Sequence, residues 1–197
     1  MPGSIKIDDG SGNYTILTNG GSLGSDKTIT IPNTTGTMAL TSDITSGLSA
    51  AQQFMLTSNI STTGTNVITS NIAVPSEANM GNLGSLVSES SGIFSFSETG
   101  YYLVQLITTS NYNSDGSYAQ IYLEATTDNT NYSRLAYTHL RGKNNLINQG
   151  FVQVILDITD TSNHKVRFST DITSGGIVLG ATSDANTTFT FFKLGDT

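Results

Sequence analysis

The stretch Thr187-Thr188-Phe189-Thr190-Phe191-Phe192-Lys193-Leu194-Gly195 decides how this chain folds. It consists mainly of β-branched and aromatic residues, which favour a pleated strand. Because it is so apolar, we expect this strand to lie inside a sheet or between subunits rather than to form a free tail.

The preceding sequence repeats the pattern, with short strands separated by turns of Ser, Thr, Asn and Gly and with almost no helical period. Many short strands with regular turn signals are typical of a sandwich or a barrel. We therefore predict an all-β protein. The predicted strands beyond residue 57 are 66–72, 92–97, 101–110, 117–126, 133–140, 151–158, 165–170, 176–179 and 188–194.

The chain divides into three predicted parts. Residues 1–44 form a small N-terminal β module, with too few large side chains to bury a core without a partner surface or identical copies. Residues 45–56 form a linker, in which Ser49–Gln53 suggests a short helix. Residues 57–197 form the C-terminal sandwich. The strands predicted in the N-terminal module are 4–7, 13–17, 27–31 and 37–40.

The composition of the chain argues against several classes of function. The net charge is -7 with 8 Lys and Arg, so we expect no nucleic-acid partner. Cysteine is absent, which leaves no disulfide, zinc-thiolate site or thiol nucleophile. We see neither a signal peptide nor a stretch of about 20 apolar residues that could cross a bilayer. These features predict a protein that is made in the cytoplasm and released inside a larger particle.

Successive side chains of a strand point to opposite faces, and this alternation assigns each residue to a face. One face of each central strand is apolar and forms the predicted core, which comprises Tyr102, Val104, Leu106, Ala119, Ile121, Leu123, Ala125, Val152, Val154, Leu156 and Ile158. The opposite faces are also apolar, and strands apolar on both sides are buried on both sides. This indicates either a thicker core or a subunit interface. We favour an interface, with candidate residues Tyr118, Tyr122, Phe151, Phe189 and Phe191.

Two stretches resemble a known family. Gly92-Ile93-Phe94-Ser95-Phe96-Ser97-Glu98-Thr99-Gly100-Tyr101-Tyr102 is similar to a signature of globular heads in the complement and tumour necrosis factor superfamily. The ending Thr188–Leu194 resembles that family's last strand, although Phe192 stands near a position where a small residue is common. The resemblance spans about residues 57–197 and implies a ten-stranded jelly roll that assembles as a homotrimer.

A second resemblance lies between Gly24 and Ile44. The segment Thr28-Ile29-Thr30-Ile31-Pro32 followed by Gly36-Thr37-Met38-Ala39-Leu40-Thr41-Ser42-Asp43-Ile44 is similar to a segment that recurs in fibre and other virion proteins of tailed bacteriophages. It implies a structural virion protein, exposed on the particle, whose residues 1–44 attach it to other capsid or tail proteins.

Catalysis and cofactors are not expected. His139 and His164 are the only imidazoles and stand far from any metal-ligand spacing or triad signature. Asp8-Asp9-Gly10-Ser11-Gly12-Asn13 lacks the closing glutamate of a calcium loop. Asp115 and Asp128 lie in predicted loops, and some relatives of the globular head bind calcium near the trimer apex. We predict no metal and no cofactor.

Three functions remain open. The first is a homotrimeric virion appendage, namely a fibre, knob or head decoration. The second is a receptor-binding module that grips a host-surface glycan or protein through loops carrying Tyr112, Tyr132 and Arg141, because tyrosine with Asn and Ser suits such contacts. The third is a glycan-cleaving enzyme, which would need paired carboxylates on a concave surface. We favour the first and expect no enzyme.

Overall fold

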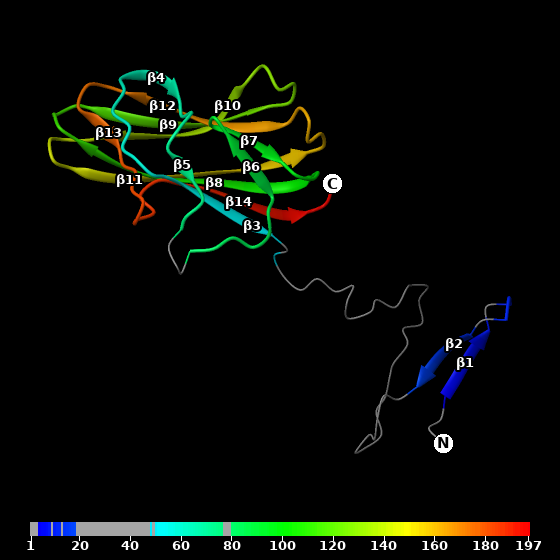
Figure 1. The fold of residues 1–197 in the computed structure, drawn as a ribbon. Coiled ribbons are helices and arrows are strands. Elements are labelled where there is room, and N and C mark those ends of the chain that lie inside the picture. Colours follow the sequence, from blue (N-terminus) through cyan, green and yellow to red (C-terminus); the bar gives the residue numbers. More distant parts are fainter. Residues whose placement is uncertain (1–3, 9, 13, 19–47, 49, 77–79) are drawn as a thin grey trace, which may run out of the picture. The chain divides into compact units, whose positions relative to one another are not determined.

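The protein consists of two compact units, residues 1–44 and 45–197. A computed structural model describes residues 4–8, 10–12, 14–18, 48, 50–76 and 80–197 (Figure 1). In the first unit, β1 (Ser4–Asp8) and β2 (Tyr14–Thr18) pair antiparallel, with Ser4 opposite Thr18. The strands predicted at 27–31 and 37–40, and the virion-like segment 24–44, lie outside the described residues.

The second unit is a sandwich of two antiparallel sheets, stacked as two layers in Figure 1. We call them the β8 sheet and the β9 sheet. The β8 sheet has the order β11 (Ile147–Ile158), β8 (Gly100–Tyr112), β14 (Thr188–Gly195), β3 (Ala51–Leu56) and β5 (Ile72–Ala73), with β13 (Gly176–Val178) pairing β8. The β9 sheet has the order β10 (Ser133–Arg141), β9 (Tyr118–Thr126), β12 (Lys165–Ile172), β7 (Ile93–Phe96) and β6 (Val87–Ser90), with β4 (Gly64–Val67) pairing β12.

An aromatic cluster fills the space between the sheets. Phe94 from β7 lies at its centre and is fully buried. Its ring centroid lies 5.1 Å from those of Phe54 and Phe191 and 5.5 Å from that of Phe168. Offset and edge-to-face ring pairs at such distances stabilise a core beyond their apolar area alone. The predicted core residues Tyr102, Val104, Leu106, Ile121 and Leu123 are fully buried around this cluster, as the alternation predicted.

Two positions in the stretch 92–102, which includes Phe94, require glycine. Gly92 has φ +80°, and a Cβ there would lie 1.8 Å from the carbonyl oxygen of Ile68. Gly100 has φ +144°, and a Cβ there would lie 2.5 Å from the carbonyl oxygen of Gly195. Both positions need a residue without a side chain, because the chain adopts a left-handed conformation in close contact with another backbone.

The short helix predicted at Ser49–Gln53 is wrong. Residues 51–56 form strand β3, which lies between β14 and β5, and the described residues contain no helix. Gln52 is buried, and its Oε1 accepts hydrogen bonds from the backbone N–H groups of Leu86 (3.0 Å) and Val87 (2.8 Å). The local helical propensity of Ala and Gln is therefore overridden by pairing with a strand far away in the sequence. No helix among the described residues is long and apolar enough to span a membrane.

Candidate functional site

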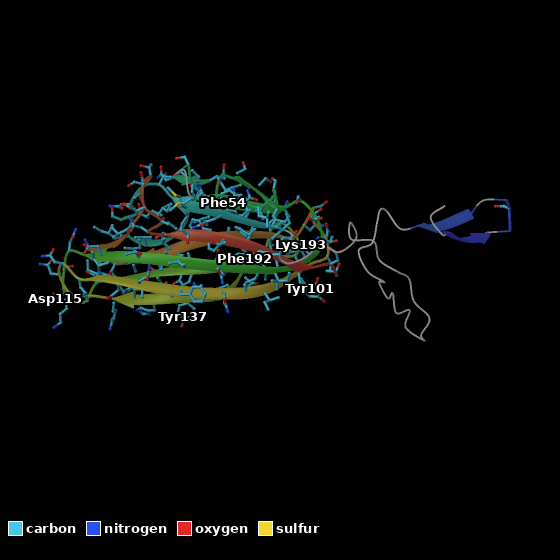
Figure 2. All side chains as sticks on the ribbon, turned by 90° about the horizontal axis from the view of Figure 1, so that it is seen from below. Phe54, Tyr101, Asp115, Tyr137, Phe192 and Lys193 are labelled. Carbon is cyan, nitrogen blue, oxygen red and sulfur yellow. The ribbon has the colours of Figure 1, made fainter. Side chains whose placement is uncertain are left out.

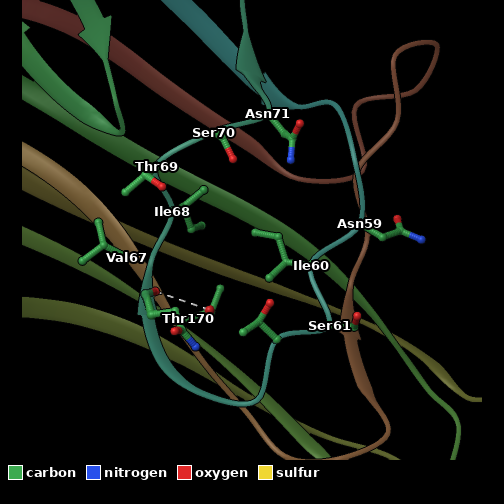
Figure 3. Close-up of a pocket in the computed structure, with 11 residues that line it drawn as sticks. Asn59, Ile60, Ser61, Val67, Ile68, Thr69, Ser70, Asn71 and Thr170 are labelled. Atoms are coloured by element: carbon green, nitrogen blue, oxygen red, sulfur yellow. Dashed lines mark hydrogen bonds between the residues drawn. The ribbon is translucent and has the colours of Figure 1, made fainter.

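A pocket of about 340 Å³ lies between residues 59–62 and residues 66–71 (Figure 3). Ile60 and Ile68 lie on opposite sides of it, and the hydroxyl of Thr170 donates a hydrogen bond of 3.4 Å to the carbonyl oxygen of Asn66. None of its lining residues is charged. General acid–base chemistry uses a titratable group within reach of the substrate, and the lining of this pocket offers only hydroxyl, amide and backbone hydrogen bonds.

The outward face of the β8 sheet carries side chains in parallel rows across four strands. The registers of β11, β8, β14 and β3 define these rows. Two mainly apolar rows flank a polar one, and in the second of them Thr188 and Met55 are buried, with 2% exposure each. From β11 to β3 the rows are Ile155-Leu103-Phe192-Ala51, then Gln153-Gln105-Thr190-Gln53, then Phe151-Ile107-Thr188-Met55.

The β11 edge of this face differs in shape from the part over β3 and β14. At the β11 edge, Ile155 and Phe151 expose 64% and 54% of their surface. Between β3 and β14, inside the sheet, a hollow of about 150 Å³ is lined by residues that include Ala51, Gln53 and Phe192. Large apolar side chains at the edge and an indentation further along the face are complementary shapes on a single subunit. In the polar row, Gln105 Nε2 donates a hydrogen bond of 3.1 Å to Gln153 Oε1.

The outward face of the β9 sheet is a network of polar and aromatic side chains. The Tyr122 hydroxyl lies 2.6 Å from Gln120 Oε1 and 3.2 Å from Asp171 Oδ2, and with one proton it donates to one of them at a time. Gln120 Nε2 lies 3.0 Å from Nδ1 of His139 on the neighbouring strand. The His139 ring is 5.3 Å from the ring of Tyr118. Burial is the main cause that raises the pKa of Tyr122.

Arginines complete this network. The guanidinium of Arg134 lies over the Tyr122 ring, 3.3 Å from its centroid. Arg167 is bonded to Glu124 by a contact of 2.7 Å from Nε to Oε2, and its guanidinium lies 4.0 Å from the ring centroid of Tyr132. The Glu124 carboxylate also accepts a hydrogen bond of 2.8 Å from the Ser169 hydroxyl. These stacked and paired contacts hold flat, charged groups in fixed positions on the sheet.

The structure does not bring the five predicted interface residues together. Phe189 and Phe191 are fully buried in the core of one chain, where they contact Phe94, so they are wrong as interface residues. Tyr118 and Tyr122 lie on the outward face of the β9 sheet, and Phe151 lies on the outward face of the β8 sheet. Side chains that point away from opposite layers of the sandwich lie in different patches of the subunit surface, so the five residues form no single patch.

The predicted receptor-contact residues are also separated. Tyr112 is fully buried, and a Cβ at Gly142 would overlap its ring, so Tyr112 is wrong as a receptor contact. Tyr132 is half-buried beneath Arg167. Arg141 is exposed at the far end of β10 from Tyr132, so the length of a strand separates the two residues that stay accessible.

The described residues contain no cluster of three or more His, Asp or Glu side chains able to hold a metal ion. Instead, Asp128 and Asp160 organise turns. Hydrogen bonds from Asn131 hold the pKa of Asp128 well below its usual range, and the Asn163 side chain lowers the pKa of Asp160 in the same way. The two loops contact each other, because the backbone N–H of Asn129 donates a hydrogen bond of 3.0 Å to the carbonyl oxygen of Asn163.

A cluster of one lysine and two carboxylates lies at the end of β14. Lys193 Nζ lies 2.7 Å from Asp196 Oδ1 and 3.2 Å from Glu98 Oε2. The hydrogen bond to Asp196 is the main cause that raises the pKa of Lys193, and the same bond lowers the pKa of Asp196. Asp115 lies at the opposite end of the sandwich from Lys193 and Tyr101 (Figure 2).

Sequence reasoning missed several side chains that form these faces. Phe192 lies on the outward face of β14, opposite the buried Phe189 and Phe191, and is not among the predicted interface residues. Tyr137 and Arg134 on β10 were not singled out, although Tyr137 has 54% of its surface exposed. Alternation along residues 133–141 points to Tyr137, His139 and Arg141 on one face, and this signal was available from the sequence.

Comparison with solved structures identifies the sandwich type. The chain resembles crystal structures of murine APRIL at pH 5.0 and pH 8.5, with TM-scores of 0.51 and 0.50, 10% and 11% identity, and coverage of 74% of this chain and 98% of the other in each case. It also resembles Eiger TNF from S. frugiperda, with a TM-score of 0.51, 15% identity, and coverage of 75% of this chain and 93% of that one. No protein-family model and no curated protein sequence matches the chain. The predicted all-β jelly roll is therefore confirmed, as a fold of the tumour necrosis factor type.

Proposed function

We propose that this chain is a non-enzymatic, homotrimeric structural subunit of a tailed-bacteriophage particle, used as a fibre, knob or head decoration. In this proposal residues 1–44 attach the subunit to other virion proteins, and the jelly roll is exposed on the particle surface. The assembly part rests on the outward face of the β8 sheet. The virion part rests on the sequence of residues 24–44, which resembles segments of phage virion proteins.

The single observation that carries the assembly is the pair of apolar rows on this face. Ile155 and Phe151 are more than half exposed, and Leu103, Ile107 and Phe192 are only partly covered. Exposed apolar side chains on both sides of one polar row are typical of a protein–protein contact. The interface therefore retains Phe151 from the sequence prediction and replaces the other four candidates with neighbours of Phe151 on the same face.

The shape of this face favours a closed ring. A protruding β11 edge and a hollow between β3 and β14 allow the edge of one copy to pack into the hollow of the next. Such a head-to-tail contact uses different patches on the two subunits, and it closes when the rotation between copies divides a full circle. Three copies is the number that the globular-head resemblance implies.

Two measurements test the proposal. Native mass spectrometry of the full chain in dilute buffer should give three times the 20.8 kDa subunit mass. Gold-labelled antibody against the chain should decorate purified particles in electron micrographs. A stable monomer would refute the assembly, whereas a trimer that is absent from particles would refute the virion role alone.

A further inference from the structure

The basic side chains of the second unit are concentrated on one sheet. The protein is acidic, with a net charge of -7, and Lys6 and Lys27 are its only Lys or Arg residues before residue 45. Five of the remaining six lie on β10, on β12 or in the loop after β10, namely Arg134, Arg141, Lys143, Lys165 and Arg167. The sixth, Lys193, lies on β14 and is paired with two carboxylates.

Most of these basic side chains lie on the outward face of the β9 sheet. Val166 and Phe168 of β12 are fully buried in the core, so Lys165 and Arg167 lie on the outward face. Arg141 lies opposite Tyr118 in the register of β10 and β9, again on this face. The outward carboxylates of these strands are Glu124 and Asp171, and Glu124 is already paired with Arg167.

The exposed cations on β10 have no carboxylate partner. Of the ion pairs among the described residues, only the one at Arg167 involves this surface. Arg134 is exposed and lies over the Tyr122 ring, and Arg141 is exposed at the far end of the strand. Both guanidinium groups therefore keep donors free for an external anion.

Exposed rings lie between the two arginines. Tyr137 and His139 follow each other on the outward side of β10, which is the edge strand of the β9 sheet. The partners of Arg134 and Arg141 on β9 are Glu124 and Tyr118, six residues or about 20 Å apart. The surface is thus a track with a cation at each end and rings between them, which we call the β10 track.

We propose that the β10 track binds an acidic polysaccharide. Guanidinium groups bind carboxylate or sulfate substituents with two parallel hydrogen bonds, and the flat Tyr137 ring provides a rigid apolar surface for a sugar ring. The backbone positions of the two arginines lie about 20 Å apart, so the arginines contact two separate acidic groups of one polymer. A nucleic-acid strand is bound by a continuous basic groove with several stacking rings, whereas the β10 track has a cation only at each end. This site goes beyond the structural role proposed above.

The test uses the full chain and three polymers at low and high salt. Alginate carries carboxylates, dextran sulfate carries sulfates, and dextran is the neutral counterpart of dextran sulfate. We expect binding to one or both acidic polymers and none to dextran in biolayer interferometry. Arg134→Ala with Arg141→Ala should weaken binding at least about tenfold, the equivalent of one charge-assisted hydrogen bond. Tyr137→Ala, which leaves the charge unchanged, should weaken it about fivefold or more.

Matched variants separate this site from general ion exchange. Ile93→Ala removes a partly exposed apolar side chain from the same sheet, and Lys6→Gln removes a cation from the first unit, so neither should change binding. Circular dichroism checks that each variant is folded. The proposal is overturned if dextran binds equally well, if Tyr137→Ala binds like the wild type, or if single-stranded DNA binds more tightly than both acidic polymers.

Discussion

Replacing Phe151 and Ile155 with aspartate should convert the assembled protein into a folded monomer. Both side chains lie on the outward face of the β8 sheet, two cross-strand rows apart, and neither belongs to the buried core. A single chain therefore loses little when they become polar. An assembly that covers them loses their apolar contact and must also bury two carboxylates.

The size of the effect follows from their exposure. Full burial of a large apolar side chain contributes about 1.5–3 kcal/mol. Because Phe151 and Ile155 expose 54% and 64% of their surface, covering both contributes about 2–4 kcal/mol per subunit, or about 6–12 kcal/mol for three copies. This corresponds to about four or more powers of ten in the equilibrium between trimer and monomer. Desolvation of the new carboxylates adds to the loss.

Sedimentation equilibrium over a range of concentrations measures this shift, and thermal unfolding reports the fold of the subunit. The matched control is Tyr137→Asp, because Tyr137 is equally exposed at 54% but lies on the other sheet. We expect the control to stay trimeric and the double variant to be monomeric with an unchanged β spectrum. A double variant that stays trimeric would refute the assignment of the interface to this face.

Three further predictions test the fold. Phe94→Ala should lower the free energy of unfolding by about 3–5 kcal/mol in urea titrations, because it leaves a cavity among fully buried rings. Gly92→Ala should cost about 1–3 kcal/mol or prevent folding, since φ is +80° and the new Cβ would overlap the Ile68 carbonyl, and equal stability of the variant would contradict this account. Asp128→Asn and Asp160→Asn should each lower Tm at pH 7. Because the folded pKa of each aspartate is lowered, its stabilisation is complete above the unfolded value of about 4 and is lost below it. The Tm difference from the wild type should therefore shrink as the pH falls below about 4, and a difference independent of pH would exclude these carboxylates as its cause.

Alternation predicted the faces of strands that have one strongly apolar side. Tyr102, Val104 and Leu106 were placed in the core and are fully buried. The same alternation continues to Tyr112, which is also buried, but the predicted strand ended at residue 110 and left this tyrosine in a loop. The true end of β8 depends on pairing with β13, and no local sequence signal marks that pairing.

Strands with two apolar sides gave no such guidance. In β14, Phe189 and Phe191 alternate with Thr190 and Phe192, so period two separates the two sets without showing which one faces the core. The choice is made by Phe94, which reaches the strand from the other sheet and contacts Phe189 and Phe191. Such a contact between distant segments is a property of the assembled sandwich, and it explains why the predicted interface was placed on the wrong side of this strand.

The two outward faces follow from one constraint on a small sandwich. Its core has room for only one side of each strand, so the other sides must meet water or a partner. On the β9 sheet, the rings of Tyr122 and Tyr132 are covered by Arg134 and Arg167, which makes that face compatible with water. On the β8 sheet, no described cation or carboxylate covers Ile155 or Phe151, and the polar row between them consists of neutral Gln and Thr. The difference between a face covered by arginine and one left apolar is the physical reason to assign assembly to the β8 sheet and ligand binding to the β9 sheet.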